Sequence, residues 1–387
     1  MSTVTTATFD QFPGQMQSAG AIAALDELAA QLRTEKKYHE LFDTRLMQAR
    51  IKAGLSVIIT QGLDDLPEPK RTQVEEGYLA ACREIGYLLL EDGKIRDAWV
   101  YLRPVGDRQS VAKALRQLSP EDDYDTIVQL ALYEGVDPEL GFKLLLEQQG
   151  CCNAITTYDT DMQNRSKKDR QAVAALLIGR VHQDLFESLR NEIKRQEGNF
   201  PAEKTITEAV ADRDWLFNND NYHIDTSHLS SVVRFAAVVE DPAVLRQAVD
   251  LCEYGRRLSP HLQYSGEQPF EELFPSSALF FRAQLGEQID EALEFFKTAG
   301  VREREEGNLG PAEVYVGLLV RLKRYEEAFD AHAELIPEKV QLSGFAPSLM
   351  EIAALGKLHD RLTSLCRDRG DLIGFVAGWI DKQQVKA

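Results

Sequence analysis

The stretch Ala81-Cys-Arg-Glu-Ile-Gly-Tyr-Leu-Leu-Leu-Glu-Asp-Gly-Lys-Ile-Arg-Asp-Ala-Trp-Val-Tyr-Leu102 predicts a pair of antiparallel helices. Gly93 interrupts an otherwise helix-favouring sequence and marks the turn between the two helices. Gly86 in the first helix and Ala98 in the second are small, so the two helices can approach each other closely. A single pair of this kind cannot bury its apolar faces alone, and it therefore needs neighbours of the same kind.

Similar helix pairs recur along the chain. When they are aligned on a small or aliphatic residue in each second helix, the separations are 42, 108, 44, 36 and 34 residues. The last two separations approach the period of about 34 residues that is typical of tetratricopeptide repeats. The residues used for the alignment are Ala98, Leu140, Ala248, Ala292, Ala328 and Leu362.

The copy Tyr315-Val-Gly-Leu-Leu-Val-Arg-Leu-Lys-Arg-Tyr-Glu-Glu-Ala328 has the shape of that repeat, with Tyr325 three residues before the alanine. Over roughly residues 70–145 and 226–370 the chain resembles the tetratricopeptide-like helical repeat superfamily, although other residues replace most of the repeat's large aromatic positions. The resemblance implies an all-α fold in which antiparallel helix hairpins stack into a right-handed superhelix, an α-solenoid. It also implies binding of extended or helical segments along the inner helices.

Four regions are predicted along the chain. Residues 1–20, rich in Ser, Thr and Gly, are expected to form a flexible tail, and residues 21–198 an N-terminal helical repeat region. Residues 199–225 are expected to be an irregular inserted loop, followed by a C-terminal tetratricopeptide-like region at 226–387. Before the insertion, an apolar residue at every fourth position predicts one long helix packed on a single neighbour. These residues are Val173, Leu177, Val181, Leu185, Leu189 and Ile193.

The charge of the chain limits the class of partner. Its 44 Lys and Arg residues against 62 Asp and Glu residues give a formal net charge of −18. Binding to nucleic acid or to an anionic membrane depends on basic side chains, so neither partner is expected. The longest apolar stretch, residues 372–380, is too short to span a bilayer. An acidic surface favours a partner with basic character.

Cysteine usage and the N-terminal residues indicate a cytoplasmic protein. The five cysteines are scattered and form no C-x-x-C pair, so neither a disulfide framework nor a cysteine zinc site is expected. The first basic residue is Arg33, whereas a secretory signal begins with a basic region followed by an apolar core.

The segment from Trp215 to His228 is the best candidate for a functional site, because it has no helical or strand periodicity and is crowded with aromatic, amide and imidazole groups. One interpretation is structural, since Asx-rich loops commonly close turns and cap helices. A second is a pocket without metal, for which the candidate ligand-binding residues are Trp215, Asn221, Tyr222 and His223.

A third interpretation is a metal site. His223, Asp225 and His228 place two imidazoles and a carboxylate within six residues, and such groups are suitable ligands for Zn or Mn. His39 or His182 could complete the ligand shell if the fold brought either of them to the loop.

Two functions of different classes follow from these observations. The first is a cytoplasmic helical-repeat scaffold that needs no cofactor and binds a peptide or protein segment with basic character on its concave surface. The alternative is a metal-dependent enzyme, or a protein that binds a small ligand, with its site at residues 215–228. The nucleotide-binding and hydrolase motifs G-x-x-x-x-G-K-S/T, G-x-G-x-x-G, G-x-S-x-G and H-E-x-x-H do not occur.

Overall fold

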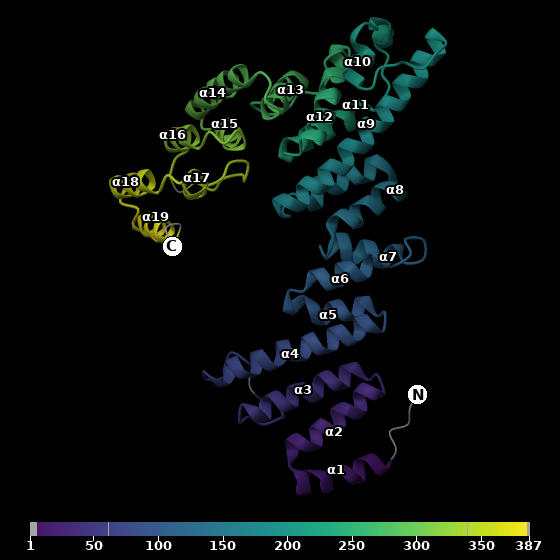
Figure 1. Cartoon of the computed structure of the whole chain (residues 1–387), viewed down its shortest axis with the longest axis vertical. Coiled ribbons are helices and arrows are strands. Elements are labelled where there is room, and N and C mark those ends of the chain that lie inside the picture. The colour runs from purple at the N-terminus through teal and green to yellow at the C-terminus, as the bar shows by residue number, and fades with distance from the viewer. Residues whose placement is uncertain (1–5, 61, 339, 385–387) are drawn as a thin grey trace. The chain divides into compact units, whose positions relative to one another are not determined.

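The computed structural model describes residues 6–60, 62–338 and 340–384, and these residues form an all-α fold (Figure 1). Helix accounts for 73% of the structure, and the described residues contain no strand. This confirms the all-α class predicted from the sequence. Within the described part of the chain, no helix is both long enough and apolar enough to cross a bilayer.

The backbone contacts divide the chain into two compact units. The first ends at Leu144 and the second begins at Leu145. Helix α8 (Pro138–Thr157) contains this boundary and is interrupted at Gly150, whose backbone has φ 77°. The long helix that sequence places in the N-terminal region therefore belongs to the second unit.

In the first unit, each helix from α1 to α5 packs on the next one along the chain. Helix α7 and a π-helical turn follow α6. Thr6–Ala19 form helix α1, which packs on α2, so this part of the expected tail is a helix; residues 1–5 lie outside the described residues. The remaining elements are α2 (Ala21–Thr34), α3 (Tyr38–Lys52), α4 (Lys70–Glu91), α5 (Ile95–Val105), α6 (Arg108–Leu115), α7 (Tyr124–Val128) and η1 (Gln129–Tyr133).

Helices α4 and α5 form the hairpin predicted from residues 81–102. Gly93 has φ 73° in the turn, which glycine adopts without strain. At Gly86 a Cβ atom would lie 2.5 Å from Leu102 Cγ, so only glycine allows this separation of the two helices. Ala98 is fully buried between them.

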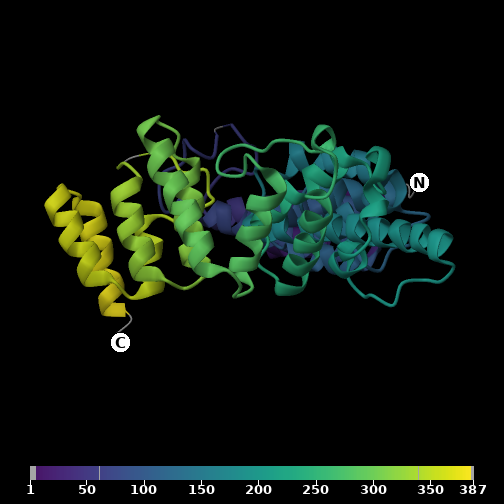
Figure 2. The same ribbon diagram turned by 90° about the horizontal axis from the view of Figure 1, so that it is seen from above.

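In the second unit, each α-helix from α12 to α19 contacts the next one along the chain (Figures 1 and 2). Five of the six residues used to align the sequence pairs are buried, and Leu140 is half-buried. The elements are η2 (Tyr158–Met162), α9 (Lys167–Glu197), α10 (Ile206–Ala211), η3 (Asp214–Asp220), α11 (Thr226–Phe235), η4 (Ala236–Val238), α12 (Pro242–Gly255), η5 (Pro260–Leu262), α13 (Leu273–Gln284), α14 (Ile289–Glu305), α15 (Gly310–Arg321), α16 (Tyr325–Leu335), α17 (Leu349–Gly356), α18 (His359–Arg369) and α19 (Leu372–Gln384).

Helix α9 is the long helix predicted from the four-residue apolar period. All six residues of that period, from Val173 to Ile193, are fully buried. The expectation of a single neighbour is wrong, because α9 packs on α10, α11, α12 and η4. These elements are shorter than α9, so several of them are needed to cover one continuous apolar stripe.

Arg321 connects several elements of the second unit. Its buried guanidinium donates hydrogen bonds to the Ala237 carbonyl at 2.8 Å and to Gln284 Oε1 at 3.1 Å. It also lies 5.2 and 5.1 Å from the ring centroids of Phe280 and Phe345. Burial lowers the pKa of Arg321 to about 10, so the side chain stays charged at neutral pH.

Candidate functional site

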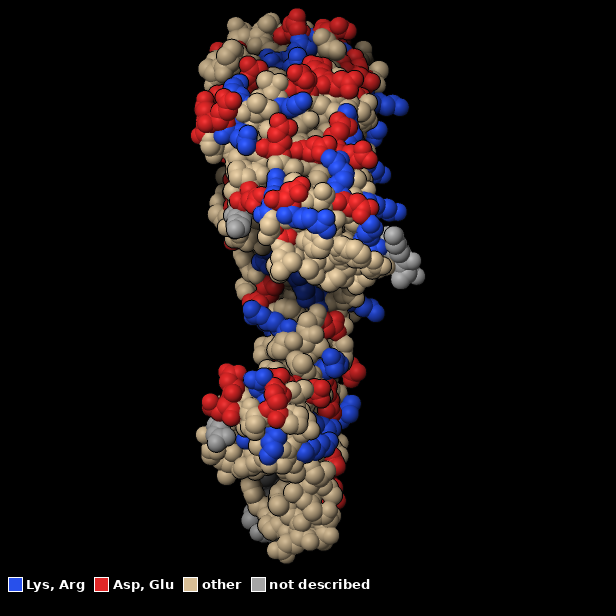
Figure 3. Space-filling model, turned by 90° about the vertical axis from the view of Figure 1, so that its left-hand side faces the viewer, with Lys and Arg blue, Asp and Glu red and all other residues tan. Residues whose placement is uncertain are grey.

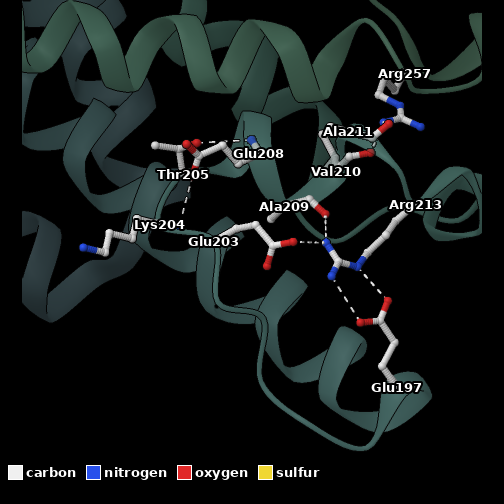
Figure 4. A network of polar contacts seen from close by, with 10 residues as sticks. All are labelled: Glu197, Glu203, Lys204, Thr205, Glu208, Ala209, Val210, Ala211, Arg213 and Arg257. Carbon is white, nitrogen blue, oxygen red and sulfur yellow. Dashed lines mark hydrogen bonds and ion pairs between the residues drawn. The ribbon is translucent and has the colours of Figure 1, made fainter.

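The inserted segment that the sequence predicts at residues 199–225 is fixed at its start by Arg213 (Figure 4). The guanidinium contacts both carboxylate oxygens of Glu197, at 2.6 and 3.1 Å, and Glu203 Oε1 at 2.9 Å. It also donates to the Ala209 carbonyl at 2.8 Å. The bidentate pair with Glu197 ties the segment to the C-terminal end of α9. The region expected to be an irregular loop thus contains helix α10 and the 3-10 turn η3.

Asp250 of α12 holds the start of α10. Its buried carboxylate accepts hydrogen bonds from the backbone N–H groups of Ile206 and Thr207, at 3.3 and 3.1 Å, and from Thr207 Oγ1 at 2.5 Å. His182 Nε2 of α9 lies 3.0 Å from the same carboxylate. Burial by itself would raise the pKa of Asp250, but the hydrogen bonds from His182 and Thr207 lower it below its usual value.

His223 faces the buried Tyr254 of α12. The Tyr254 hydroxyl accepts from the His223 backbone N–H at 2.8 Å and lies 3.1 Å from Nδ1 of the ring. The His223 and Tyr254 rings meet edge to face, and Phe217 packs on both of them. Burial lowers the pKa of His223 and so favours the neutral ring, whose Nδ1 can accept a hydrogen bond from the Tyr254 hydroxyl.

Asp225 and His228 have separate local roles. Asp225 Oδ1 accepts from the backbone N–H groups of Ser227 and His228, at 2.9 and 3.1 Å, and so caps helix α11. His228 lies in the first turn of that helix, whereas His223 points to Tyr254. No group of three or more His, Cys, Asp or Glu residues that could hold a metal ion is found in the described part of the chain. The divalent-metal interpretation therefore stays a prediction from the sequence alone.

The other candidate ligand-binding residues differ in exposure. Trp215 is half-buried in η3, and Asn221 is exposed, donating from Nδ2 to the Leu216 carbonyl at 3.1 Å. Tyr222 is 54% exposed. Asn221 Nδ2 is 3.5 Å from His223 Nε2, so these two side chains do approach each other.

The two further histidines that sequence offered as ligands have other contacts. His39, in the first unit, lies with Nδ1 2.6 Å from the hydroxyl of Tyr101. His182 contacts Asp250 as described above. Each of them is thus paired outside residues 223–228.

A groove that sequence reasoning missed lies between α13, α14 and the end of α12. Its volume is about 760 Å³, and the connection before α13 closes one side. The side chain of Phe295 and the surfaces of Leu279 and Pro275 supply apolar wall. Such a groove is large enough for several side chains of an extended or helical segment.

The charges of this groove, which we call the α13–α14 groove, are unequally compensated. Its three arginines are already paired: Arg256 and Arg282 contact Glu253 at 3.1 and 3.0 Å, and Arg302 contacts Glu303 at 3.0 Å. Four glutamates also line it, and none of them forms an ion pair with Lys or Arg in the part of the chain that the structure describes. They are Glu271, Glu272, Glu291 and Glu294. The groove therefore presents uncompensated negative charge beside an apolar wall.

A second cavity, of about 520 Å³, lies between α16, α17, α18 and the start of α19. Its walls are mostly apolar and include Leu349, Met350 and Leu362. His332 of α16 lines it, and although this residue is only 8% exposed, neither ring nitrogen has a hydrogen-bond partner among the described residues. Burial lowers the pKa of His332 and favours the neutral ring. We call this the His332 cavity.

Little in the sequence indicated these two sites. Glu291 and Phe295 are one helical turn apart, which places them on one face, but such pairs are common in an acidic helical protein. The groove is lined by α13, α14 and the segments beside them, and the cavity by four helices, so the positions of both sites depend on packing.

Comparison of the chain with protein-family models, with curated proteins and with solved structures gave no match.

Proposed function

We propose that this protein is a helical-repeat scaffold whose α13–α14 groove binds a peptide or protein segment that carries basic side chains. In this proposal the helix hairpins stack in the tetratricopeptide-like manner, as a right-handed superhelix, and the protein acts in the cytoplasm. The observation that carries the proposal is the groove, in which four glutamates have no cationic partner among the described residues, while each of the three arginines contacts a carboxylate.

A basic partner would gain free energy at the carboxylates of the groove. Lysine or arginine side chains of a bound segment would find carboxylates that are not already neutralised, and they would not have to displace an internal ion pair. Phe295, which is exposed at the groove, offers apolar surface for a neighbouring side chain of the same segment. The same carboxylates would repel an acidic segment, so charge also makes the groove specific for basic segments over acidic ones.

Fluorescence anisotropy with two labelled probe peptides tests the proposal. One peptide alternates Lys with Leu, and the other has Glu in place of every Lys. We expect the Lys peptide to bind, with an affinity that falls as NaCl is raised from about 0.05 to about 0.5 M, and the Glu peptide not to bind.

The matched variants are E291Q/E294Q, in the groove, and E326Q/E334Q, which changes the same charge at exposed positions of α16 outside the groove. The groove variant should weaken binding about five- to tenfold, corresponding to about 1 kcal/mol, and the control should bind nearly as the parent does. Equal weakening in both variants would indicate a general charge effect and contradict the groove as the site. Failure of the Lys peptide to bind at low salt would contradict the proposed function itself.

A further inference from the structure

Helix α19 packs on α18 through its glycines and leaves its large apolar side chains outside. Gly374 and Gly378 are buried against α18, where a Cβ atom would lie 2.7 Å from Cys366 Sγ at Gly374 and 3.0 Å from Leu362 at Gly378. The opposite face of α19 carries five exposed residues, which we call the α19 stripe: Leu372, Ile373, Val376, Trp379 and Ile380. Figure 3 views the molecule from the side on which α18 and α19 lie in Figure 1, and part of the surface on that side carries no charged side chains.

The large apolar side chains of the α19 stripe contribute little to the packing of α19 within a single chain, because they bury little area against the rest of that chain. Leu372 and Ile373 are 71% and 76% exposed, and Trp379 is 50% exposed. Contiguous exposed apolar patches larger than a few hundred Å² mark interaction sites.

The α19 stripe is continuous with the His332 cavity. Leu372 and Ile373 belong to the stripe and also line the cavity, so they form its mouth. His332 lines the same cavity, and both nitrogens of its ring are without a partner among the described residues. A buried polar group without a partner costs free energy, and a hydrogen-bonding group placed in the cavity would recover it.

We propose that the α19 stripe and the His332 cavity together form a self-complementary surface that binds a second copy of this chain through antiparallel pairing of the two α19 helices. This surface is distinct from the α13–α14 groove and does not depend on the function proposed for that groove.

Helix geometry supports this occupant. Seven residues separate Leu372 from Trp379, which is about 10 Å along the helix. In a two-fold, antiparallel pair centred near Val376, the Trp379 end of one helix meets the Leu372 end of its partner. Each Trp379 then lies at the mouth of the other copy's His332 cavity, and the indole supplies an apolar body and an N–H donor.

The area is sufficient for a dimer of moderate affinity. From the exposed fractions of its five side chains, each stripe offers roughly 500 Å² to a partner, so two copies bury about 1,000 Å² in total. This is the size at which specific interfaces begin. An indole in a desolvated cavity is also the kind of group that contributes most to binding.

Sedimentation of the full chain between about 0.1 and about 100 μM tests the pairing, with a dimer expected at the upper end. Ile373→Glu and, separately, Trp379→Gln should each raise the dimer Kd at least about thirtyfold. Val100→Glu, at an exposed apolar position of α5, is the matched control and should leave the Kd unchanged. Far-ultraviolet circular dichroism confirms that each variant has the parent's helix content.

A cysteine experiment tests the antiparallel register. Ile373→Cys and Ile380→Cys lie about equally far on either side of the centre of the stripe, so a mixture of the two variants should form a disulfide-linked heterodimer that neither variant forms alone. If the chain sediments as a monomer at every concentration, the proposed pairing is overturned. A dimer that is insensitive to both α19 variants, or one that resists Trp379→Gln alone, would also overturn it.

Discussion

Asp250 offers a sharp test of how the inserted segment is held. Its carboxylate accepts from the buried N–H groups of Ile206 and Thr207, from the Thr207 hydroxyl and from His182. Asp250→Ala removes every one of these acceptors at once. An unsatisfied buried donor costs about 1–3 kcal/mol, and water entering the vacated volume would recover part of it. We expect a loss of about 2–4 kcal/mol in the free energy of unfolding.

Asp250→Asn separates charge from shape. The amide keeps the volume and one oxygen acceptor but turns an NH₂ group toward the donors, so we expect a loss of about 1–2 kcal/mol. Because the folded-state pKa of Asp250 lies below its usual value, the carboxylate stabilises the folded state above the unfolded-state pKa of about 3.9. That contribution disappears as the pH falls through the folded-state pKa. The difference between the parent and Asp250→Asn should therefore shrink below about pH 4.

Urea unfolding followed by circular dichroism measures these free energies, and hydrogen exchange reports on the segment itself. Backbone amides of residues 203–212 should exchange faster in Asp250→Ala, whereas amides of the first unit should not change. A loss below about 0.5 kcal/mol for Asp250→Ala, or unchanged exchange at 203–212, would refute the assignment of Asp250 as the anchor of α10.

Three further outcomes are expected. Gly86→Ala should destabilise the first unit by about 1–3 kcal/mol, because its methyl group overlaps Leu102; an unchanged melting temperature would contradict this. Arg321→Met should cost about 1–3 kcal/mol in urea unfolding, since two carbonyl acceptors lose their donor, and a stability equal to that of the parent would show the contacts to be dispensable. Metal analysis of tag-free protein should give the same substoichiometric content for the parent and for His223→Ala/His228→Ala, while near-stoichiometric metal lost in the variant would revive the metal interpretation.

The helices and their closest pairs could be predicted from the sequence, because the interactions that produce them are local. Gly93 marks a turn, Gly86 and Ala98 mark a close approach, and all three have these roles in the structure. Helix α9 follows from a four-residue apolar period, because a helical backbone presents residues four apart on one face. The capping interpretation of the inserted segment is equally local, since Asp225 accepts from N–H groups two and three residues later.

The sites depended on residues distant in sequence, and only the tertiary structure could place them. The partner of His223 is Tyr254, 31 residues away, and no local pattern connects the two. The uncompensated charge of the α13–α14 groove follows from the pairing of Arg282 with Glu253 of another helix. The sequence of α19 contains a glycine face and a large apolar face, and amphipathicity would have assigned the large face to the core. Packing decided otherwise, because close approach to α18 requires the glycines, and this left Trp379 exposed.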